Sequence, residues 1–180
     1  SWDKPFEAPE HVCSSYDNCH VPWGSTHEKT WHLVKTLPHV SGLFVWTGFD
    51  YLGEPTPYWW PSRSSFFGIV DLAGFPKDVY YMYKSEWTDE PVLHIFPHWN
   101  WKEGEPVDIW AYYNNADEVE LYLNGKSLGV RQKTDSTYHV SWRVPFTPGT
   151  LRAVSRLGGK EVLVKEIHTA GEPARLVLTL

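Results

Sequence analysis

Short runs of alternating apolar and polar residues mark the second half of the chain. An alternation with a period of two is typical of β-strands that bury one face. Asn124-Gly125 and Gly158-Gly159 lie between such runs and are strong signals for tight hairpins. Short strands at this turn spacing predict an antiparallel β-sandwich of the immunoglobulin type. The expected strands include Val107–Tyr113, Val119–Leu123, Val140–Val144, Leu151–Arg156 and Val162–Ile167.

The first half has a different pattern, which predicts helices around a buried strand. One helix is expected to begin with Ser25 or Thr26 as its N-cap residue and to end at Pro38. The apolar run Val40–Trp46 then predicts a buried strand, and a long loop follows it. Because proline is favoured at the first position of a helix, a second helix is expected from Pro76 to about residue 87.

The two patterns predict a division of the chain near Asp89–Pro91, with residues 1–89 as one unit and residues 90–180 as the sandwich. A buried strand of the parallel type needs neighbours on both sides, and roughly 90 residues supply only one such strand. The first unit is therefore expected to be the end of a larger domain. The run Arg175–Leu180 predicts a strand that leads into a further domain. Since neither an initiator Met nor a signal peptide is visible at Ser1, the gene is expected to begin further upstream.

Composition and charge narrow the classes of partner. The formal net charge is -6 at pH 7 and Lys and Arg form no cluster, which argues against nucleic acids and anionic membranes. Apolar residues make up 42% of the chain, yet no run approaches the ~18 residues of a membrane span. The 11 Trp and 10 Tyr residues are the unusual feature. Such a content also occurs in ordinary cores and interfaces, but it favours carbohydrate recognition, because a flat apolar ring suits the C–H face of a pyranose.

Trp46 and the loop behind it carry the candidate chemistry. Trp46 ends the expected strand, and Asp50 and Glu54 follow it among glycines and prolines. An indole face can stack on a sugar while carboxylates accept hydrogen bonds from its hydroxyls, so this segment predicts a sugar-binding wall. A second hypothesis makes Asp50 and Glu54 a catalytic pair. It is less favoured, because spacing within a loop does not define the separation of two carboxyl groups.

Cysteines and histidines suggest no metal site. Cys13 and Cys19 fit no zinc spacing and are expected to be free thiols, with a local disulfide as the alternative. His94 and His98 would share one strand face, but a third ligand at a suitable spacing is missing. We therefore expect structural histidines, and neither a metal nor another cofactor.

Four longer blocks carry a family resemblance: Ser14–Cys19, Val21–Thr26, Gly42–Pro57 and Gly68–Asp78. With them in view, the chain resembles part of a glycoside hydrolase family 2 β-galactosidase of Bacteroides-like bacteria. The resemblance implies that residues 1–89 are the last β/α segments of a (β/α)8 TIM barrel and that residues 90–180 are the immunoglobulin-like domain that follows it.

The resemblance also implies a division of roles among residues. Enzymes of this family retain the anomeric configuration with two glutamates ~5 Å apart, and both are expected before the chain begins, so these 180 residues alone should be inactive. Trp46 matches the tryptophan at the mouth of barrel strand eight, which lines the sugar subsite, and the peptide bond after it is expected to be cis. Asp50 matches the acidic position that follows, and Glu54 is a weaker match. Asp17 and Asn18 would lie in the loop after strand seven, on the catalytic face.

The implied enzyme belongs to bacterial carbohydrate metabolism, in the periplasm or outside the cell. Its partners would be a β-galactoside oligosaccharide or glycoconjugate, bound at a terminal β-D-galactose, and the rest of its own chain; a homo-oligomer stays open. Rival hypotheses are a β-glucuronidase or β-mannosidase, a non-catalytic carbohydrate-binding module, and a purely structural module. The binding module would need an exposed row of Trp99, Trp101, Trp110 and Trp142. Instead, Trp142 is expected in the sandwich core, and Trp99 and Trp101 are expected to pack against the barrel.

Overall fold

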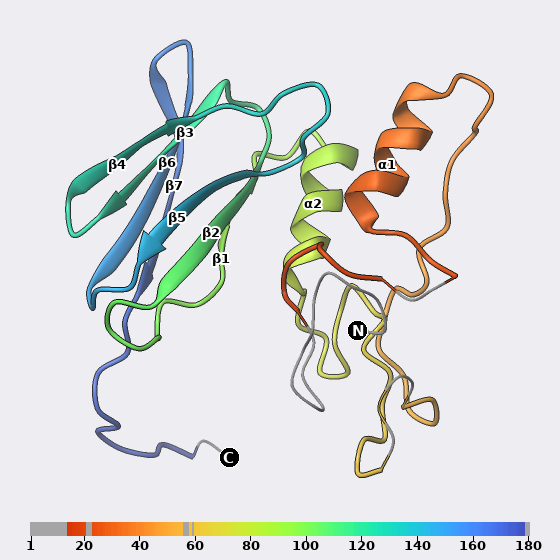
Figure 1. Ribbon diagram of the computed structural model, residues 1–180, viewed down its shortest axis with the longest axis horizontal. Helices are drawn as coiled ribbons and strands as arrows, with labels where there is room; N and C mark the ends of the chain where they lie inside the picture. The colour runs from red at the N-terminus through yellow and green to blue at the C-terminus, as the bar shows by residue number, and fades with distance from the viewer. Residues whose placement is uncertain (1–13, 21–22, 56–57, 59, 179–180) are drawn as a thin grey trace.

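The computed structural model describes residues 14–20, 23–55, 58 and 60–178 of the chain (Figure 1). Predictions that concern Cys13, or the part of the final strand at residues 179–180, lie outside this range. Within it, two stacked β-sheets stand on one side and two helices on the other. Helix α2 (Asp78–Trp87) lies between the sheets and helix α1 (His27–Thr36) (Figure 1).

The second half forms an antiparallel sandwich of a three-stranded and a four-stranded sheet. The sheet orders are β1-β2-β5 and β4-β3-β6-β7, and every pairing is antiparallel. This four-plus-three arrangement confirms the predicted sandwich and is consistent with the immunoglobulin type. The strands are β1 (Leu93–Phe96), β2 (Pro106–Tyr113), β3 (Glu118–Leu123), β4 (Lys126–Arg131), β5 (Val140–Pro145), β6 (Thr150–Leu157) and β7 (Lys160–His168).

Two tight turns set the register of the four-stranded sheet. Asn124 and Gly125 join β3 to β4 with φ angles of 51° and 81°, and Gly158 and Gly159 join β6 to β7 with 56° and 77°. Two successive positive φ angles are what a two-residue hairpin requires, because they match the twist of the flanking strands. Both predicted hairpins are therefore confirmed.

The alternating residues fill the space between the two sheets. Ile109 in β2 lies opposite Trp142 in β5, and both are buried. The Trp142 indole donates its N–H to the carbonyl of Gly129 at 3.0 Å, so the ring is buried without an unpaired donor. The prediction that Trp142 belongs to the core is confirmed.

The position of Trp99 differs from the prediction. We expected it to pack against the barrel, but it lies in the sandwich core with 1% of its surface exposed. Its ring meets Phe146 edge-on, and its N–H donates to the carbonyl of Thr147 at 3.0 Å. Trp101, its neighbour in the same loop, stacks on His98 instead. With Trp99 and Trp142 both buried, these tryptophans do not form an exposed platform for sugar.

The two helices begin and end close to the predicted positions. Thr26 is the N-cap of α1, which ends at its C-cap Leu37, directly before Pro38. Helix α2 starts at Asp78 rather than at Pro76. Pro76 instead forms an antiparallel bridge with Val70, and this extended pairing delays the start of the helix by two residues.

The prediction of a buried strand at Val40–Trp46 is wrong for the described part of the chain. The segment is irregular, and Phe44 is fully exposed. A strand forms only where a neighbour accepts its backbone hydrogen bonds. Pairing starts one residue later, where Thr47–Asp50 runs parallel to Phe67–Val70 through bonds such as Thr47 N–H to the Phe67 carbonyl at 3.1 Å. Apart from this pairing and the helices, no (β/α)8 barrel is evident in the described residues.

The final run is also not a strand. Residues 175–178 have no regular structure, and Leu176, Val177 and Leu178 are largely exposed. After β7 the chain runs away from both sheets, so this run has no strand beside it in the described part of the chain (Figure 1). As at Val40–Trp46, a strand-like sequence without a partner stays irregular.

Helix α2 is attached to the sandwich by a buried aromatic cluster. Met82 and Tyr83 of α2 pack with Phe96 of β1, Tyr112 of β2 and Tyr138, and all five are at most 3% exposed. Burial of large side chains such as these stabilises by about 1.5–3 kcal/mol each. The helix and the sandwich therefore share one apolar core.

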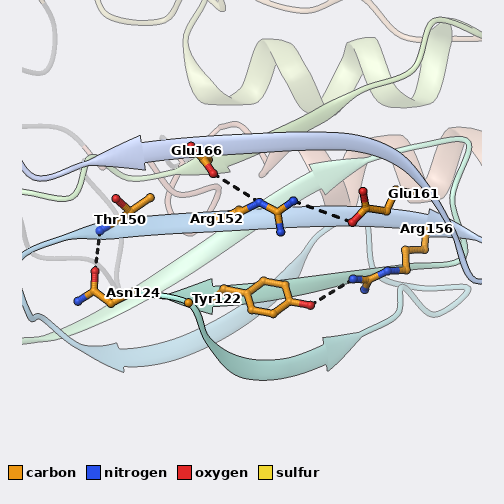
Figure 2. A pocket seen from close by; sticks show the side chains of 8 residues that line it. Tyr122, Asn124, Thr150, Arg152, Arg156, Glu161 and Glu166 are labelled. Carbon is orange, nitrogen blue, oxygen red and sulfur yellow. Dashed lines mark hydrogen bonds and ion pairs between the residues drawn. The ribbon is translucent and has the colours of Figure 1, made fainter.

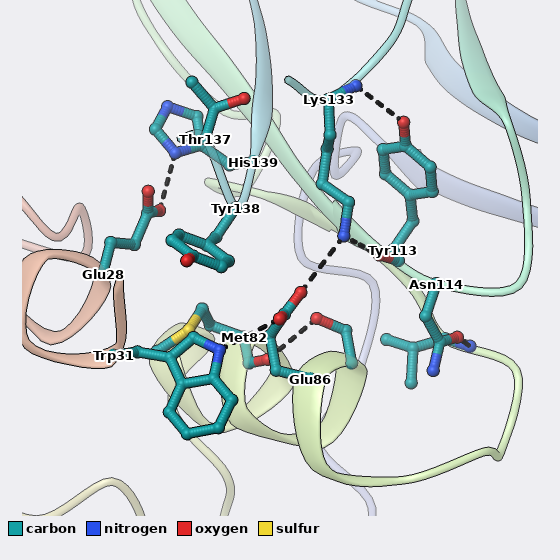
Figure 3. Close-up of polar contacts among 12 residues, drawn as sticks. Glu28, Trp31, Met82, Glu86, Tyr113, Asn114, Lys133, Thr137, Tyr138 and His139 are labelled. Atoms are coloured by element: carbon teal, nitrogen blue, oxygen red, sulfur yellow. Dashed lines mark hydrogen bonds and ion pairs between the residues drawn. The ribbon is translucent and has the colours of Figure 1, made fainter. Parts of the chain in front are cut away.

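Glu86 adds a polar junction beside that cluster (Figure 3). Its carboxylate accepts the Trp31 indole N–H at 2.9 Å and the ammonium of Lys35 at 3.0 Å, both from α1. Lys133, from the loop before β5, lies 3.3 Å away and also donates to the carbonyl of Tyr113 at 2.8 Å. One carboxylate thus connects both helices to the sandwich.

A second contact joins α1 to the sandwich directly. His139, just before β5, hydrogen-bonds Glu28 of α1 at 2.6 Å (Figure 3). The imidazole also stacks on the Trp110 ring, with 3.6 Å between the centroids and 5° between the planes. Tyr138 contributes its hydroxyl to His32 of α1 at 3.1 Å.

The Glu86 junction predicts a pH dependence of stability. Burial raises the pKa of Glu86, but Trp31, Lys35 and Lys133 together outweigh it and hold the pKa below its ordinary value of 4.5. A depressed folded-state pKa means that the stabilisation is complete above pH 4.5 and is lost as the pH falls through the folded value. Glu86→Gln should therefore destabilise the chain by about 1–3 kcal/mol at pH 7 and flatten its acid limb.

Urea denaturation from pH 3 to pH 7 measures this dependence. Glu103→Gln is the matched control, since Glu103 is exposed in the loop before β2. Equal acid limbs in Glu86→Gln and the unsubstituted chain would show that Glu86 does not carry the effect.

Candidate functional site

A cavity of about 840 Å³ opens beside the helices, on the side of the predicted sugar-binding segment. Several stretches of chain line it: the loop and first turns around the start of α1, the irregular run that ends at Trp46, Glu54 in the loop that follows, the run Phe66–Gly68, and the start of α2. Among the predicted site residues, Trp46, Glu54 and Asp17 line the cavity, whereas Asp50 and Asn18 are not part of its wall.

Trp46 presents its ring to this cavity. The side chain is 74% exposed, and the indole N–H donates to the Tyr51 hydroxyl at 3.3 Å. The bond Trp46–Thr47 is cis, as the family resemblance implied. An exposed indole at a cavity wall is available for stacking on a ligand ring.

Asp50 acts as a brace within the fold. Its carboxylate accepts the Gly68 N–H at 2.8 Å and pairs with the Lys77 ammonium at 2.7 Å, while Lys77 also donates to the carbonyl of Phe66. Position 68 has to be glycine, because a Cβ there would lie 2.2 Å from the backbone nitrogen of Asp50. The Asp50 side chain is 9% exposed, and both of its oxygens have protein donors. A contact with substrate stays a prediction.

Glu54 lies on the other side of the same loop, exposed to the cavity. It accepts the Tyr51 hydroxyl in a short hydrogen bond. Asp50 and Glu54 therefore have separate partners, one in an enclosed ion pair and one in an exposed hydrogen bond. This division gives no support to the hypothesis that they form a catalytic pair, which needs two carboxyl groups free to act on one bond.

Asp17 caps helix α1 from ten residues upstream. It accepts the N–H of His27 at 2.9 Å and the N–H of Glu28 at 2.7 Å, whereas the N-cap Thr26 makes no side-chain capping bond. Burial raises the pKa of Asp17, and the opposing effects of His27 and of the two N–H donors are smaller. The local pattern could not have identified this cap, since capping is read from residues adjacent to the helix.

His27 completes a partly buried polar group at the cavity wall. Its Nδ1 lies 2.9 Å from the Tyr83 hydroxyl, and burial lowers the pKa of His27. Asn18, one residue after Asp17, has a buried Oδ1 with no hydrogen-bond partner in the described part of the chain. Because buried acceptors are nearly always paired, this oxygen points to a donor supplied from outside the described residues.

A second hollow of about 450 Å³ lies on the outer face of the four-stranded sheet (Figure 2). Arg152 sits over the Tyr122 ring and contacts Glu166 at 3.4 Å, and Arg156 donates to the Tyr122 hydroxyl at 3.1 Å. In this hollow the charged side chains are paired with one another. Arg152 covers one face of Tyr122, the aromatic ring among the lining residues. Exposed ion pairs of this kind are ordinary surface features.

The other chemistry-bearing residues have separate structural partners. His94 bonds Asp78 at 2.7 Å and stacks on Tyr81, while His98 lies beyond the end of β1, so the two histidines do not share a strand face. Cys19 is a free thiol. Across residues 14–20, 23–55, 58 and 60–178, no group of three or more His, Cys, Asp or Glu side chains could hold a metal ion, and neither helix is long and apolar enough to cross a membrane.

Comparison of the sequence identifies related proteins. A family model described as a domain of unknown function, DUF4982, matches residues 104–163. A β-galactosidase of Bacteroides ovatus is 63% identical over 178 residues, which is 99% of this chain and 21% of that protein. A putative β-glucuronidase of Formosa agariphila is 42% identical over 171 residues, or 91% of this chain and 16% of that protein.

Comparison of the fold leads to the same group. A β-glycosidase from Bacteroides vulgatus superimposes with a TM-score of 0.81 and 40% identity, over 89% of this chain and 20% of that structure. A glycosyl hydrolase family 2 member from Bacteroides cellulosilyticus gives 0.69 and 31%, over 81% of this chain and 24% of that structure. The chain thus spans about a fifth of the length of its relatives.

The brace at Asp50 predicts strong coupling between two substitutions. Asp50→Asn and Lys77→Met should each destabilise the chain by about 1–3 kcal/mol, because Lys77→Met leaves the nearly buried Asp50 without its cation and Asp50→Asn removes the charge that holds Lys77. The double variant should cost little more than either one. Thermal or urea denaturation of the four proteins measures the coupling energy. The same cycle on the exposed pair Asp108–Arg143 is the control and should give a small value; additive costs at Asp50 and Lys77 would show that the pair is not a brace.

Proposed function

Because the chain belongs to glycoside hydrolase family 2, we propose that it is part of a retaining β-galactosidase that releases terminal β-D-galactose. In this proposal residues 1–89 are the last segments of the catalytic barrel and residues 90–180 are the immunoglobulin-like domain behind it. The identity of 63% over nearly the whole chain is the observation that carries the choice of galactosidase. The two parts are held together by the apolar core that α2 shares with the sandwich.

The chain's part in the reaction is to build one wall of the galactose subsite. Trp46 offers an exposed indole face and Glu54 an exposed carboxylate, while Asp17 lines the same cavity with both its oxygens already accepting N–H groups of α1. Stacking on the apolar face of the sugar and hydrogen bonds to its hydroxyls are the contacts that this chemistry supports. Asn18 lies next to Asp17, but its Oδ1 is buried outside the cavity wall, so a sugar contact of Asn18 is not part of this proposal.

The bond-breaking groups belong to another part of the enzyme. A retaining glycosidase needs a general acid and a nucleophile ~5 Å apart on either side of the glycosidic bond. Asp50 is held by Lys77 and Glu54 by Tyr51, so neither fills these roles in the proposal. The subsite wall accelerates the reaction only through contacts that strengthen as the sugar flattens toward its oxocarbenium-like transition state.

A β-glucuronidase is the second candidate, since several relatives carry that name, including the one from Formosa agariphila. A uronate would need a cation free to pair with its carboxylate. Lys77 lines the cavity, but its ammonium is already held by Asp50 and by the carbonyl of Phe66. This engagement favours a neutral sugar over a uronate.

Kinetics of the full-length protein with nitrophenyl glycosides test the proposal. The β-galactoside should be the best substrate, ahead of the β-glucuronide and the β-mannoside, and the first sugar released should keep the β configuration in an NMR time course. The 180 residues alone should show no turnover. A preference for the β-glucuronide would replace the proposal with the second candidate, and turnover by the purified chain that Glu54→Gln abolishes would restore the loop-carboxylate hypothesis.

Substitution of Trp46 should separate catalysis from folding. In the full-length protein Trp46→Ala should lower kcat/KM by ~10²-fold or more, because contacts that grow in the transition state are lost. Its cost in stability should be well below the ~3–5 kcal/mol of a buried tryptophan, since most of the ring is exposed. Trp46→Phe should recover part of the activity.

Trp142→Ala is the contrasting variant. Trp142 is 4% exposed in the sandwich core, so its loss should cost ~3–5 kcal/mol and leave kcat/KM of the folded fraction near normal. Melting temperature and kcat/KM of both variants decide the assignment. An unfolded Trp46→Ala protein with normal activity per folded molecule would identify Trp46 as a core residue.

A further inference from the structure

The Trp46 ring has few neighbours to hold it in place. Most of its surface is exposed, so packing does not restrict the two side-chain torsions as it would in a core. The Tyr51 ring meets it edge-on, with 6.3 Å between the centroids and 89° between the planes, and the Tyr51 hydroxyl accepts the indole N–H at 3.3 Å. The ring contact bears on the plane of the indole, and the hydrogen bond bears on the position of its nitrogen edge.

Tyr51 is itself held from two directions. Its backbone is paired with Ser65: the Tyr51 N–H donates to the Ser65 hydroxyl at 3.0 Å, and the Ser65 N–H donates to the Tyr51 carbonyl at 2.8 Å. Ser65 is 2% exposed, so this anchor is buried. The Tyr51 hydroxyl donates to Glu54, which the turn at Gly53 (φ 98°) brings back toward Tyr51.

We propose that Tyr51, oriented by Glu54, is a positioning residue that holds the Trp46 indole in the plane required to stack on the sugar. The inference rests on the proposed function, because it assumes that Trp46 contacts the substrate. Trp46 and Glu54 line the cavity and Tyr51 does not, so Tyr51 acts through the indole.

The hydrogen-bond chain has a defined direction. An ionised Glu54 only accepts, so the Tyr51 hydroxyl donates to it and keeps a lone pair for the indole N–H, which only donates. The bond to Glu54 raises the pKa of Tyr51 above its ordinary value of 10.0, which keeps the hydroxyl protonated across the working range of an enzyme. Removal of the hydroxyl breaks both bonds at once.

A double-mutant cycle on the full-length enzyme tests the inference. Tyr51→Phe should lower kcat/KM for nitrophenyl β-galactoside by about 10-fold, the equivalent of one lost hydrogen bond, with most of the loss in kcat. In a Trp46→Ala background the same substitution should change kcat/KM by less than about 2-fold, because the group it positions is gone. Tyr80→Phe on α2 is the matched control and should leave both constants unchanged.

Substitutions of Glu54 provide a second route if Tyr51→Phe folds poorly. Glu54→Ala removes the acceptor of the Tyr51 hydroxyl and should lower kcat/KM by about 10-fold or more, whereas Glu54→Gln keeps an acceptor and should recover part of that loss. The loss caused by Glu54→Ala should be smaller in the Trp46→Ala background, because the part of the effect that acts through the indole is gone, and an equal loss in both backgrounds would contradict the positioning role. Melting temperatures of all variants show whether a loss is one of folding.

The outcomes distinguish this inference from the function on which it rests. If Trp46→Ala is strongly impaired but Tyr51→Phe is harmless, or reduces activity equally in both backgrounds, the positioning role is wrong and the subsite stands. A fall in melting temperature that accounts for the whole loss in Tyr51→Phe would also overturn the role. If Trp46→Ala retains native kcat/KM, the subsite assignment fails, and the positioning role fails with it.

Discussion

The packing of α2 against the sandwich is the contact on which the rest of the arrangement depends. Met82 and Tyr83 bury themselves against strands β1 and β2, and this places Glu86 where α1 and the Lys133 loop can both reach it. Helix α1 has no buried residue of its own, so it depends on these partners for its position. Since Asp17 binds the first turn of α1, the cavity wall is aligned from the sandwich through two helices.

The reach of each interaction along the chain explains which parts of the fold followed from the sequence. In the second half, β3–β4 and β6–β7 pair through two-residue turns, so the Asn124-Gly125 and Gly158-Gly159 pairs together with the alternation predicted the sandwich, although β2–β5 and β3–β6 pair across longer stretches. In the first half, the run Val40–Trp46 has a strand's composition but no partner beside it in the described chain. The composition of a segment shows how much apolar surface it could bury. Whether the segment forms a strand depends on whether a neighbouring segment is present to pair with it.

The candidate site shows the same limit at the level of single residues. The exposed position of Trp46 could be predicted, because the aromatic residue stands where an apolar run changes to Gly, Pro and carboxylates. The brace between Asp50 and Lys77 could not, since 27 residues separate them and neither flanking pattern refers to the other. The capping of α1 by Asp17 could not be predicted either, because Asp17 lies ten residues before the helix. Nor could the burial of Trp99, whose N–H donates to a carbonyl 48 residues away.

Partly buried carboxylates and exposed side chains have different roles at the candidate site. The carboxylates with the most protein donors, Asp17 and Asp50, hold the backbone around the cavity, and the groups left exposed toward it are Trp46 and Glu54. A charge that braces backbone N–H groups is costly to free, so it serves geometry better than ligand exchange. An exposed indole loses little by meeting a sugar face and gains contact area when it does. The same loop can therefore be rigid in its backbone and available at its surface, which is what a subsite that must favour a flattened sugar requires.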